Sequence, residues 1–418
     1  MDKIKLPIGV KRFRIGDFGF RRHLTEIRNP KSAICPPLSV LMLLMLFFSK
    51  SNTITAQKST QPKMNWQLLD SLPNIGVAGA FGGVHNGAMM VAGGANFPNG
   101  MPWEGGKKQY HNDIYIFKKN RNGRVKRLET SFKLSGNIAY GASVSTPKGI
   151  VCMGGENENG VSDKVFLMRW NAENQAIEIE FLPSLPLPLT NCAAILRGSI
   201  LYVSGGESDN KTTNSFLSLD INDGTAAWKI LPNLPKPISH AVTVAQSDGI
   251  YVIGGRAKTA SGISDLYNSV FKFDTKQNIW IPLSNISDGQ QTITALTAGT
   301  GIAIDNQYIV LFGGDKGETF HQVETLLAAI AIEKEDSKKQ ELVLKKNQIL
   351  ASHPGFSKDV LLYNTQTNKW SKIGTIPLHS PVTTTAFRWG KRIIIPSGEI
   401  RAGVRTPYIL AVDIQNEK

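Results

Sequence analysis

One short pattern occurs six times along the chain: an apolar segment runs into a pair of small residues, usually Gly-Gly, and a polar or small residue follows. The copies are VAGGA at 91–95, MGGE at 153–156, SGGE at 204–207, IGGR at 253–256, FGGD at 312–315 and PSGE at 396–399. In most steps the second glycines are about 50 to 60 residues apart, a length typical of one blade in a repeat propeller. Repetition of this kind restricts the fold to an array of similar units.

Each repeat reads as four short strands, called a to d, separated by turn residues. In the fourth repeat these strands cover 240–246, 249–255, 268–274 and 278–283. Strand d carries a tryptophan in several repeats, at Trp228, Trp280 and Trp370, and a further copy, Trp66, precedes the first glycine pair. The glycine pairs, the spacing and these tryptophans together indicate blades of the kelch type.

The two ends of the repeat array complement each other. Trp66 lies in a strand d with no strands a to c before it, whereas 407–413 reads as a strand c with no d after it. We expect the N-terminal strand at 64–70 to complete the last blade, because an open ring would leave an unpaired sheet edge. The sequence therefore predicts an all-β fold, a six-bladed kelch-type β-propeller closed by the N-terminal strand.

One b–c loop is expected to contain a helical insertion, at about 316–356. Val323, Leu326, Leu327 and Ile330 follow the i, i+3, i+4, i+7 spacing of a helical stripe, and a charged run follows them. Two interpretations stay open: a helix packed on the propeller rim, or a lid over the face that carries the b–c loops.

The N-terminal segment has the features of a secretory signal. Residues 1–56 hold ten Lys/Arg and three Asp/Glu, so this segment supplies +7 of the formal net charge of +14. A basic stretch precedes the apolar run 38–48, and Thr53–Ala56 offers a cleavage site before Gln57. We expect a signal peptide at 1–56 that directs export, and a propeller domain at 57–418. We expect no nucleic-acid partner and no stable membrane insertion after cleavage. An uncleaved anchor is the alternative.

The residue after each glycine pair begins a b–c loop, and six such positions are expected to surround the central channel. The candidates for lining this channel are Asn96 (after Ala95), Glu156, Glu207, Arg256 and Asp315, together with Glu399 and with His240, which opens a strand a. Charged groups that converge on one cavity suit a polar ligand. For most single positions, a side chain that merely solvates a loop is the alternative. The histidines and the two cysteines after residue 56 show no ligand spacing, so we expect no metal and no cofactor.

The sixth copy differs from the others, because Ser397-Gly398 replaces Gly-Gly and Glu399 shares a loop with Arg405. A carboxylate can take and return a proton. An arginine can hold a substrate carboxylate through two parallel hydrogen bonds and stay charged. This loop is therefore the candidate for chemistry.

Three sets of segments resemble the N-acetylneuraminate epimerase family, in the order of its cyclically permuted mutarotase subgroup. The segments are GVAGAFGGV at 76–84 with VAGGAN at 91–96, then Ala139-Tyr-Gly141 with Met153-Gly-Gly-Glu156 in the next blade, and a third set, Gly398-Glu399 with Gly403-Val-Arg405-Thr406. The resemblance implies a periplasmic isomerase that interconverts the α and β anomers of N-acetylneuraminate, a small-molecule sugar acid, by ring opening and reclosure. It also implies that Glu399 is the proton acceptor and that Arg405 meets the substrate carboxylate.

Other propeller functions remain as alternatives. A non-catalytic kelch-repeat module that binds carbohydrate or protein is the main one, since one fold hosts many functions. A sialidase is disfavoured because its Ser-x-Asp-x-Gly-x-Thr-Trp boxes are missing. A copper radical oxidase is disfavoured because its His, Tyr and Cys ligands are not recognisable. The sugar, the proton donor to the ring oxygen and the oligomeric state stay open.

Overall fold

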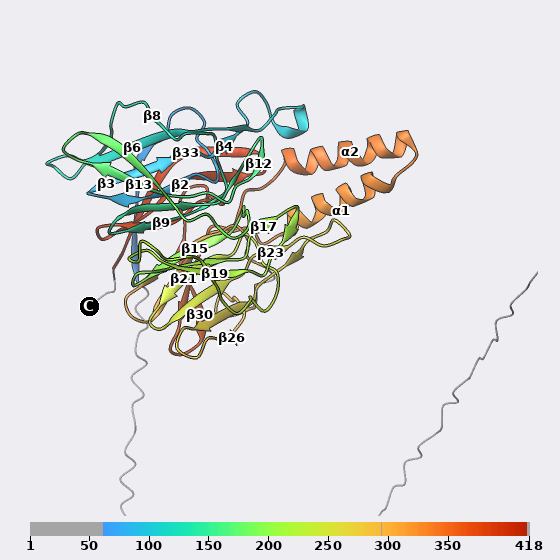
Figure 1. Ribbon diagram of the computed structural model, residues 1–418. Helices are drawn as coiled ribbons and strands as arrows, with labels where there is room; N and C mark the ends of the chain where they lie inside the picture. The colour runs from blue at the N-terminus through green and yellow to red at the C-terminus, as the bar shows by residue number, and fades with distance from the viewer. Residues whose placement is uncertain (1–61, 294, 416–418) are drawn as a thin grey trace, which may run out of the picture. The chain divides into compact units, whose positions relative to one another are not determined.

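The computed structural model describes residues 62–293 and 295–415, and the expected signal segment lies outside this range. Six large antiparallel sheets make up most of this part of the chain, and two α-helices lie between two strands of the fifth sheet. The sheets follow one another along the chain as the blades of a propeller (Figure 1). The predicted six-bladed all-β architecture is confirmed.

The first three blades each run from an innermost strand a to an outer strand d. Blade 1 contains β2 (Phe81–His85), β3 (Ala88–Ala92), β6 (Asp113–Lys119), β7 (Val125–Arg127) and β8 (Phe132–Lys133). Blade 2 contains β9 (Ala142–Thr146), β10 (Gly149–Met153), β13 (Val165–Asn171) and β14 (Ala176–Leu182). Blade 3 contains β15 (Ala193–Arg197), β16 (Ile200–Ser204), β19 (Phe216–Asp220) and β20 (Lys229–Ile230).

The remaining blades repeat this order. Blade 4 contains β21 (Val242–Gln246), β22 (Gly249–Ile253), β25 (Val270–Asp274) and β26 (Ile279–Leu283). Blade 5 contains β27 (Thr300–Ile304), β28 (Tyr308–Phe312), β29 (Asp359–Asn364) and β30 (Lys369–Thr375). Blade 6 contains β31 (Phe387–Trp389), β32 (Arg392–Arg401), β33 (Val404–Gln415) and β1 (Lys63–Ser71).

Short two-stranded hairpins extend four of the b–c loops: β4 (Ala95–Asn96) with β5 (Gln109–Tyr110), β11 (Glu156–Asn157) with β12 (Gly160–Val161), β17 (Glu207–Ser208) with β18 (Lys211–Thr212), and β23 (Arg256–Ala257) with β24 (Asp265–Leu266).

The N-terminal strand closes the ring, as the sequence predicts. Strand β1 pairs with β33 in antiparallel register from Lys63 opposite Gln415 to Ser71 opposite Tyr408. Blade 6 therefore takes its outer strand from one end of the described chain and its other three strands from the opposite end. This pairing satisfies the edge that β33 would otherwise expose.

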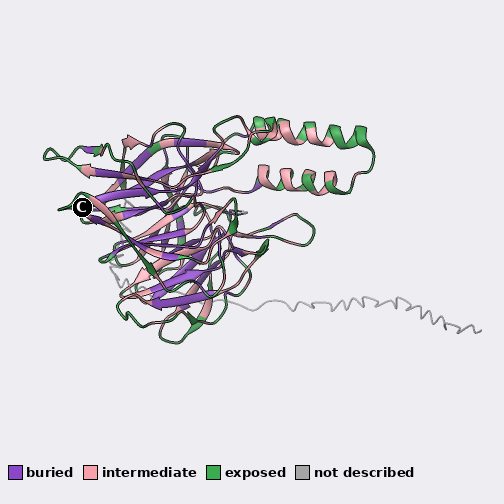
Figure 2. Ribbon diagram, turned by 45° about the horizontal axis from the view of Figure 1, so that its top comes forward, coloured by how far each residue is buried: buried purple, intermediate pink, exposed green. Residues whose placement is uncertain are grey.

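Buried apolar side chains gather between neighbouring blades rather than at one centre. One cluster joins Val242 and Tyr251 of blade 4 to Leu311 and Tyr363 of blade 5, and comparable clusters occupy the other blade interfaces. Figure 2 shows buried residues along the strands of the blades and exposed residues at their loops. Each blade thus depends on its two neighbours for its core.

The strand d tryptophans fasten adjacent blades with hydrogen bonds. The indole Nε1 of Trp228 donates to Pro183 O at 2.8 Å, that of Trp280 to Pro232 O at 2.9 Å, and that of Trp370 to Ser284 O at 3.1 Å. In each case the acceptor lies one or two residues after strand d of the preceding blade. The repeated tryptophan is therefore a structural device.

The insertion consists of two helices in the b–c loop of blade 5, and their presence there confirms the prediction. Helix α1 covers Glu318–Ile332 and helix α2 covers Asp336–Ala351. They pack against each other as a hairpin that projects from the propeller (Figure 1), and no residue of either helix is buried. This differs from the expectation of a helix packed on the rim. Within the described ranges, neither helix is long and apolar enough to cross a membrane.

Candidate functional site

A closed ring of backbone hydrogen bonds surrounds the propeller axis just ahead of the innermost strands. In each blade one N–H donates to the carbonyl of the equivalent residue in the preceding blade, at 2.7 to 3.0 Å. All six residues have φ between 53° and 69°. The members of this axial ring are Gly79, Tyr140, Asn191, His240, Ala298 and Thr383.

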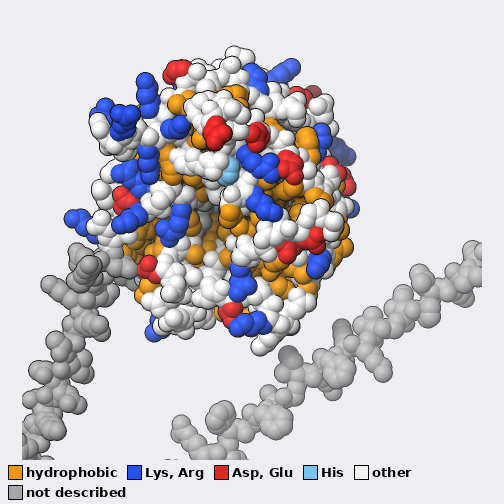
Figure 3. All heavy atoms as spheres, turned by 60° about the vertical axis from the view of Figure 1, so that its left-hand side comes forward, with side chains coloured by type: hydrophobic (Ala, Val, Ile, Leu, Met, Phe, Trp, Pro, Cys, Tyr) orange, Lys and Arg blue, Asp and Glu red, His pale blue; other side chains and the backbone are white. Residues whose placement is uncertain are grey.

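The axial ring and the six innermost strands line a central cavity of about 430 Å³. Small residues such as Gly141, Ala193 and Gly301 form much of its wall. On the side of the molecule away from the helical hairpin, apolar side chains line a hollow that basic and acidic side chains surround (Figure 3). Glu399 and Arg405 are not part of this wall. They belong to the b–c loops on the opposite side of the axial ring.

The residues after the glycine pairs occupy equivalent positions in the six blades. Each forms an isolated β-bridge with the residue that precedes its blade's member of the axial ring: Ala95 with Ala78, Glu156 with Ala139, Glu207 with Thr190, Arg256 with Ser239, Asp315 with Thr297, and Glu399 with Val382. The structure therefore places five of the predicted candidates at the same level of the channel.

Asn96 is one residue out of this register, and its side chain has other partners. The amide Nδ2 donates to Gly76 O at 2.9 Å, and Oδ1 lies 2.9 Å from His111 Nε2. The side chain is 6% exposed. Asn96 thus stabilises a loop of blade 1, and Ala95 holds the position that corresponds to Glu399.

Glu399 and Arg405 form an ion pair across the β32–β33 hairpin. They are direct partners in the strand register, and Arg405 Nη1 lies 3.1 Å from Glu399 Oε1. The backbone N–H of Gly403, in the turn, donates to the same carboxylate oxygen at 2.8 Å. The Glu399 side chain is 22% exposed and that of Arg405 only 3%, so the carboxylate reaches solvent while the guanidinium is buried.

Arg405 spans three blades. Its Nε donates to Ala95 O of blade 1 at 3.3 Å, its Nη2 donates to Tyr140 Oη of blade 2 at 3.4 Å, and its guanidinium lies 5.1 Å from the centre of the Phe97 ring. Nη1 has no hydrogen-bond partner among the described residues, although it is ion-paired with Glu399. A buried N–H without an acceptor suits a carboxylate oxygen of a ligand.

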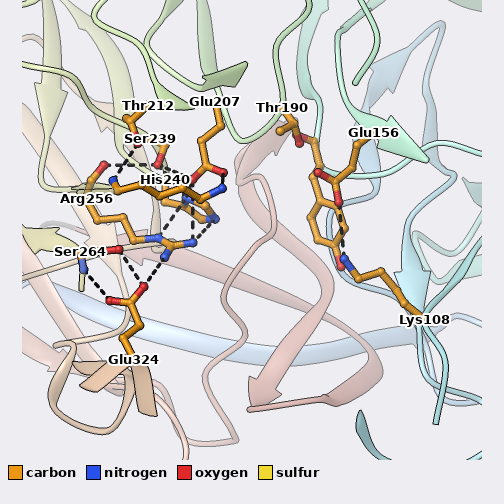
Figure 4. Close-up of polar contacts among 12 residues, drawn as sticks. Lys108, Glu156, Thr190, Glu207, Thr212, Ser239, His240, Arg256, Ser264 and Glu324 are labelled. Atoms are coloured by element: carbon orange, nitrogen blue, oxygen red, sulfur yellow. Dashed lines mark hydrogen bonds and ion pairs between the residues drawn. The ribbon is translucent and has the colours of Figure 1, made fainter. Parts of the chain in front are cut away.

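A second charged group lies at the mouths of blades 3 and 4 (Figure 4). Glu207 accepts from Ser239 Oγ at 2.9 Å and pairs with Lys258 Nζ at 2.7 Å. His240 contacts Arg256 at 3.4 Å, and burial together with the charges of Arg256 and Lys258 holds the pKa of His240 well below its usual value. His240 is therefore uncharged at neutral pH.

Helix α1 covers Arg256 of this group. Glu324 Oε1 lies 3.7 Å from Arg256 Nη1 and also accepts from Ser264 Oγ at 2.8 Å (Figure 4). The Arg256 guanidinium lies 4.4 Å from the centre of the Phe320 ring. Burial lowers the pKa of Arg256, although the nearby carboxylates of Glu207, Glu324 and Asp315 act to raise it. The base of the helical hairpin thus contacts the channel mouth directly.

Glu156 and Asp315 have separate surroundings. Glu156 accepts from Tyr110 Oη at 2.8 Å and lies 3.5 Å from Lys108 Nζ, apart from the Glu207 group (Figure 4). Burial raises the pKa of Asp315, whose Oδ1 accepts from Gly317 N at 2.8 Å. No three His, Cys, Asp or Glu side chains are grouped to hold a metal ion within 62–293 and 295–415.

Sequence reasoning noted Tyr140 as part of the family resemblance but gave it no role, and it missed the axial ring to which Tyr140 belongs. The signal is the residue directly before each strand a, in the segments VAGA, IAYG, LTNC, ISHA, LTAG and VTTT. Aligning the six repeats on this position, instead of on the glycine pair, would have placed Tyr140 and Asn191 beside His240.

Comparisons with known proteins agree with this architecture. A family model described as N-acetylneuraminate epimerase matches residues 49–177 and 182–418. The N-acetylneuraminate epimerase of Vibrio cholerae is 38% identical over 123 residues, which are 25% of this chain and 30% of that protein. The Brucella suis enzyme of the same name is 33% identical over 131 residues, which are 27% of this chain and 32% of that protein. The Salmonella typhimurium enzyme of that name is 25% identical over 240 residues, 57% of this chain and 59% of its own. These alignments therefore span about a third to three fifths of the relatives' lengths. A solved structure titled "Structure of YjhT" covers 84% of this chain and all of its own, with a TM-score of 0.56 and 16% identity, which shows a shared fold.

Proposed function

Because the chain belongs to the N-acetylneuraminate epimerase family, we propose that it is a mutarotase that interconverts the α and β anomers of N-acetylneuraminate or a closely related sugar acid. The observation that carries the proposal is the Glu399–Arg405 pair. It unites a partly exposed carboxylate with a buried guanidinium whose Nη1 is ion-paired with Glu399 but makes no hydrogen bond among the described residues. A base and a carboxylate-binding group next to one another match the chemistry of a 2-keto sugar acid, whose carboxylate adjoins its anomeric carbon.

In the proposed reaction, Arg405 binds the C1 carboxylate and Glu399 takes the proton of the anomeric hydroxyl at C2. The bond between C2 and the ring oxygen breaks as the ring oxygen gains a proton. The open keto form turns its C2 carbonyl over and recloses on the other face. The sugar carboxylate replaces part of the contact that Arg405 makes with Glu399, which frees a Glu399 oxygen to act as the base.

The test is anomer exchange measured by NMR exchange spectroscopy on N-acetylneuraminate. The wild-type protein is expected to accelerate exchange, and Glu399→Gln is expected to lose roughly 100-fold or more of the acceleration while staying folded. Glu158→Gln is the matched control, since Glu158 is an exposed turn residue of the same face that accepts a hydrogen bond from Asn137 Nδ2. Wild-type rates in Glu399→Gln would remove Glu399 from the mechanism.

A non-catalytic carbohydrate-binding module makes a different prediction for the same experiment. It would bind the sugar without any change in its exchange rate. A small panel of keto and aldo sugars tests the substrate as well, because activity on glucose or galactose but not on the sugar acid would overturn the substrate assignment.

The proposal includes export to the periplasm and a propeller domain at 57–418. Its support is the sequence of residues 1–56, with a basic stretch, an apolar run and a cleavage site before Gln57. Removal of this segment lowers the formal net charge from +14 to +7, which weakens any general attraction to nucleic acid. Cell fractionation with N-terminal sequencing is expected to recover a chain that begins at Gln57, whereas an intact N-terminus in the membrane fraction would indicate an anchor.

A further inference from the structure

We propose that the hydroxyl of Tyr140 is the acid that protonates the ring oxygen during ring opening. This inference rests on the proposed mutarotase function and supplies the group that the sequence leaves unidentified. It begins from the contact between Tyr140 Oη and Arg405 Nη2, at 3.4 Å. The side chain that meets the sugar carboxylate therefore touches Tyr140 on one side and Glu399 on the other.

Gly79 leaves room for the Tyr140 ring that makes this contact. Arg405 belongs to blade 6 and Tyr140 to blade 2, and Gly79 is the member of the axial ring that belongs to blade 1, between them. A Cβ at Gly79 would collide with the Tyr140 ring, and Gly79 has a φ of +69° that favours glycine. The absence of a side chain at Gly79 thus allows the Tyr140 ring of blade 2 to lie where its hydroxyl contacts Arg405 of blade 6.

The position of Tyr140 is determined by several independent contacts. Its N–H donates to Gly79 O at 2.7 Å and its C=O accepts from Asn191 N at 2.7 Å. Its ring meets Tyr110 edge-on with 6.4 Å between centroids, and Lys108 Nζ lies 4.9 Å from the ring centre. A catalytic acid needs this kind of preorganisation, because its proton must be delivered at one place.

Tyr140 also holds its proton at physiological pH. Burial raises its pKa to about 12, against the opposing influence of Arg405, which lowers it. The hydroxyl is therefore a donor in the resting protein. As the proton leaves, the Arg405 guanidinium and the Lys108 ammonium are in place to stabilise the phenolate that forms.

The protons and electrons balance in the proposed step. Glu399 takes the anomeric O–H proton, and that O–H pair forms the C2 carbonyl. The bond between C2 and the ring oxygen breaks, its electron pair stays on the ring oxygen, and the Tyr140 O–H proton joins that oxygen. Reclosure on the other face of C2 reverses each transfer, so that the phenolate regains its proton from the sugar hydroxyl and Glu399 returns its own.

The neighbouring groups are less suited to this role. The Glu156 carboxylate is an acceptor for Tyr110, and His240 is uncharged and in contact with Arg256 in the separate charged group. Asp315 has a raised pKa, but its contact is with the turn that leads into α1. Asp315 is therefore the competing candidate for the acid, and Asp315→Asn is measured beside the Tyr140 variant.

Tyr140→Phe tests the proposal, because it removes only the hydroxyl and keeps the ring in its packing. We expect kcat for anomer exchange of N-acetylneuraminate to fall roughly 100-fold or more, with KM nearly unchanged. Tyr115→Phe is the control. Tyr115 is a half-buried tyrosine of β6, away from Arg405, and burial raises its pKa as it does that of Tyr140. A loss in Asp315→Asn with a fully active Tyr140→Phe would transfer the role to Asp315.

Further outcomes distinguish a catalytic role of Tyr140 from a positioning role, and both from failure of the proposed function. A raised KM with unchanged kcat in Tyr140→Phe would show that Tyr140 only orients Arg405, and would overturn the proposal. Replacement of Tyr140 by 3,5-difluorotyrosine, whose phenol is more acidic, should restore the exchange that Tyr140→Phe loses. It should also lower the pH at which kcat falls on the alkaline side of the pH profile. A pH profile that does not move would contradict proton donation. If the wild-type protein does not accelerate exchange, the mutarotase function itself fails, with Tyr140 along with it.

Discussion

Ser397 and Glu399 lie two residues apart in the irregular sixth copy of the repeat. Ser397 is fully buried, accepts from Val77 N at 2.9 Å, and its hydroxyl lies 2.7 Å from Val77 O and Thr406 O. It adopts a φ of 52°, which glycines supply in the other five copies. The departure from Gly-Gly therefore fastens blade 6 to the segment before blade 1. The candidate chemistry belongs to Glu399 and Arg405 beyond it.

The buried charge state of His240 leads to a prediction about pH. Its pKa in the folded protein is well below the value near 6.5 of the unfolded chain, so the unfolded state binds a proton that the folded state does not. The stability from this residue is present above pH 6.5 and is lost as the pH falls below it, by up to about 1.4 kcal/mol per pH unit. Burial also lowers the pKa of His85, His111 and His353, which act in the same direction.

Urea unfolding at pH 7.5 and pH 5 checks this prediction. His240→Gln should lose less stability between the two values than the wild-type protein does. His379→Gln, at an exposed histidine, should follow the wild-type slope. Equal slopes for all three proteins would show that His240 does not carry the effect.

At the scale of the element, the glycine pair is a turn that each blade needs in order to meet the next one. Gly205 and Gly206 both have positive φ, and Gly206 N donates to Ile238 O of blade 4 at 2.9 Å. A Cβ at Gly205 would collide with the same Ile238 carbonyl. The glycine pair therefore recurs because the contact between adjacent blades requires this turn, whereas the residue after the pair differs from blade to blade.

Gly205→Ala should therefore destabilise the propeller strongly. The left-handed conformation and the collision with a backbone atom together cost about 2 to 5 kcal/mol. Gly224→Ala is the comparison, because a Cβ there meets open space and Gly224 has no positive φ. Chemical denaturation that gives equal midpoints for the two variants would contradict this account of the repeat.

The helical insertion shows how far local patterns reach. The apolar stripe at 323–330 predicted a helix, and α1 covers it. The stripe could not reveal that a second helix would pack against the first as a hairpin, because that depends on the contact between α1 and α2. The contact of Glu324 and Phe320 with Arg256 is likewise a product of the loop's course over the channel mouth.

At the scale of the whole molecule, closure by β1 determines whether six blades form a ring. Without β1, strand β33 would expose an unpaired edge, and Met64 and Trp66 would leave the core between blades 5 and 6. A chain that begins at Leu72 should therefore lose its cooperative thermal transition and aggregate, whereas a chain that begins at Gln57 should keep both its transition and its solubility.

Near-UV circular dichroism during heating measures this difference, and a peptide of residues 62–72 added in trans should restore the transition. If the chain that begins at Leu72 melts at the same temperature as the one that begins at Gln57, closure by β1 does not govern stability.

The amino-acid sequence was sufficient to predict the number of blades, the closing strand, the place of the insertion and the loop that Glu399 and Arg405 share, because all of these follow from the repeat pattern along the chain. Only the folded chain shows that Arg405 contacts Tyr140, that Asn96 turns to His111, and that helix α1 covers Arg256. The first and the last of these contacts join different blades, whereas that of Asn96 lies within the b–c loop of blade 1. All three depend on how loops and side chains lie in three dimensions, and repeat spacing along the chain does not contain that information.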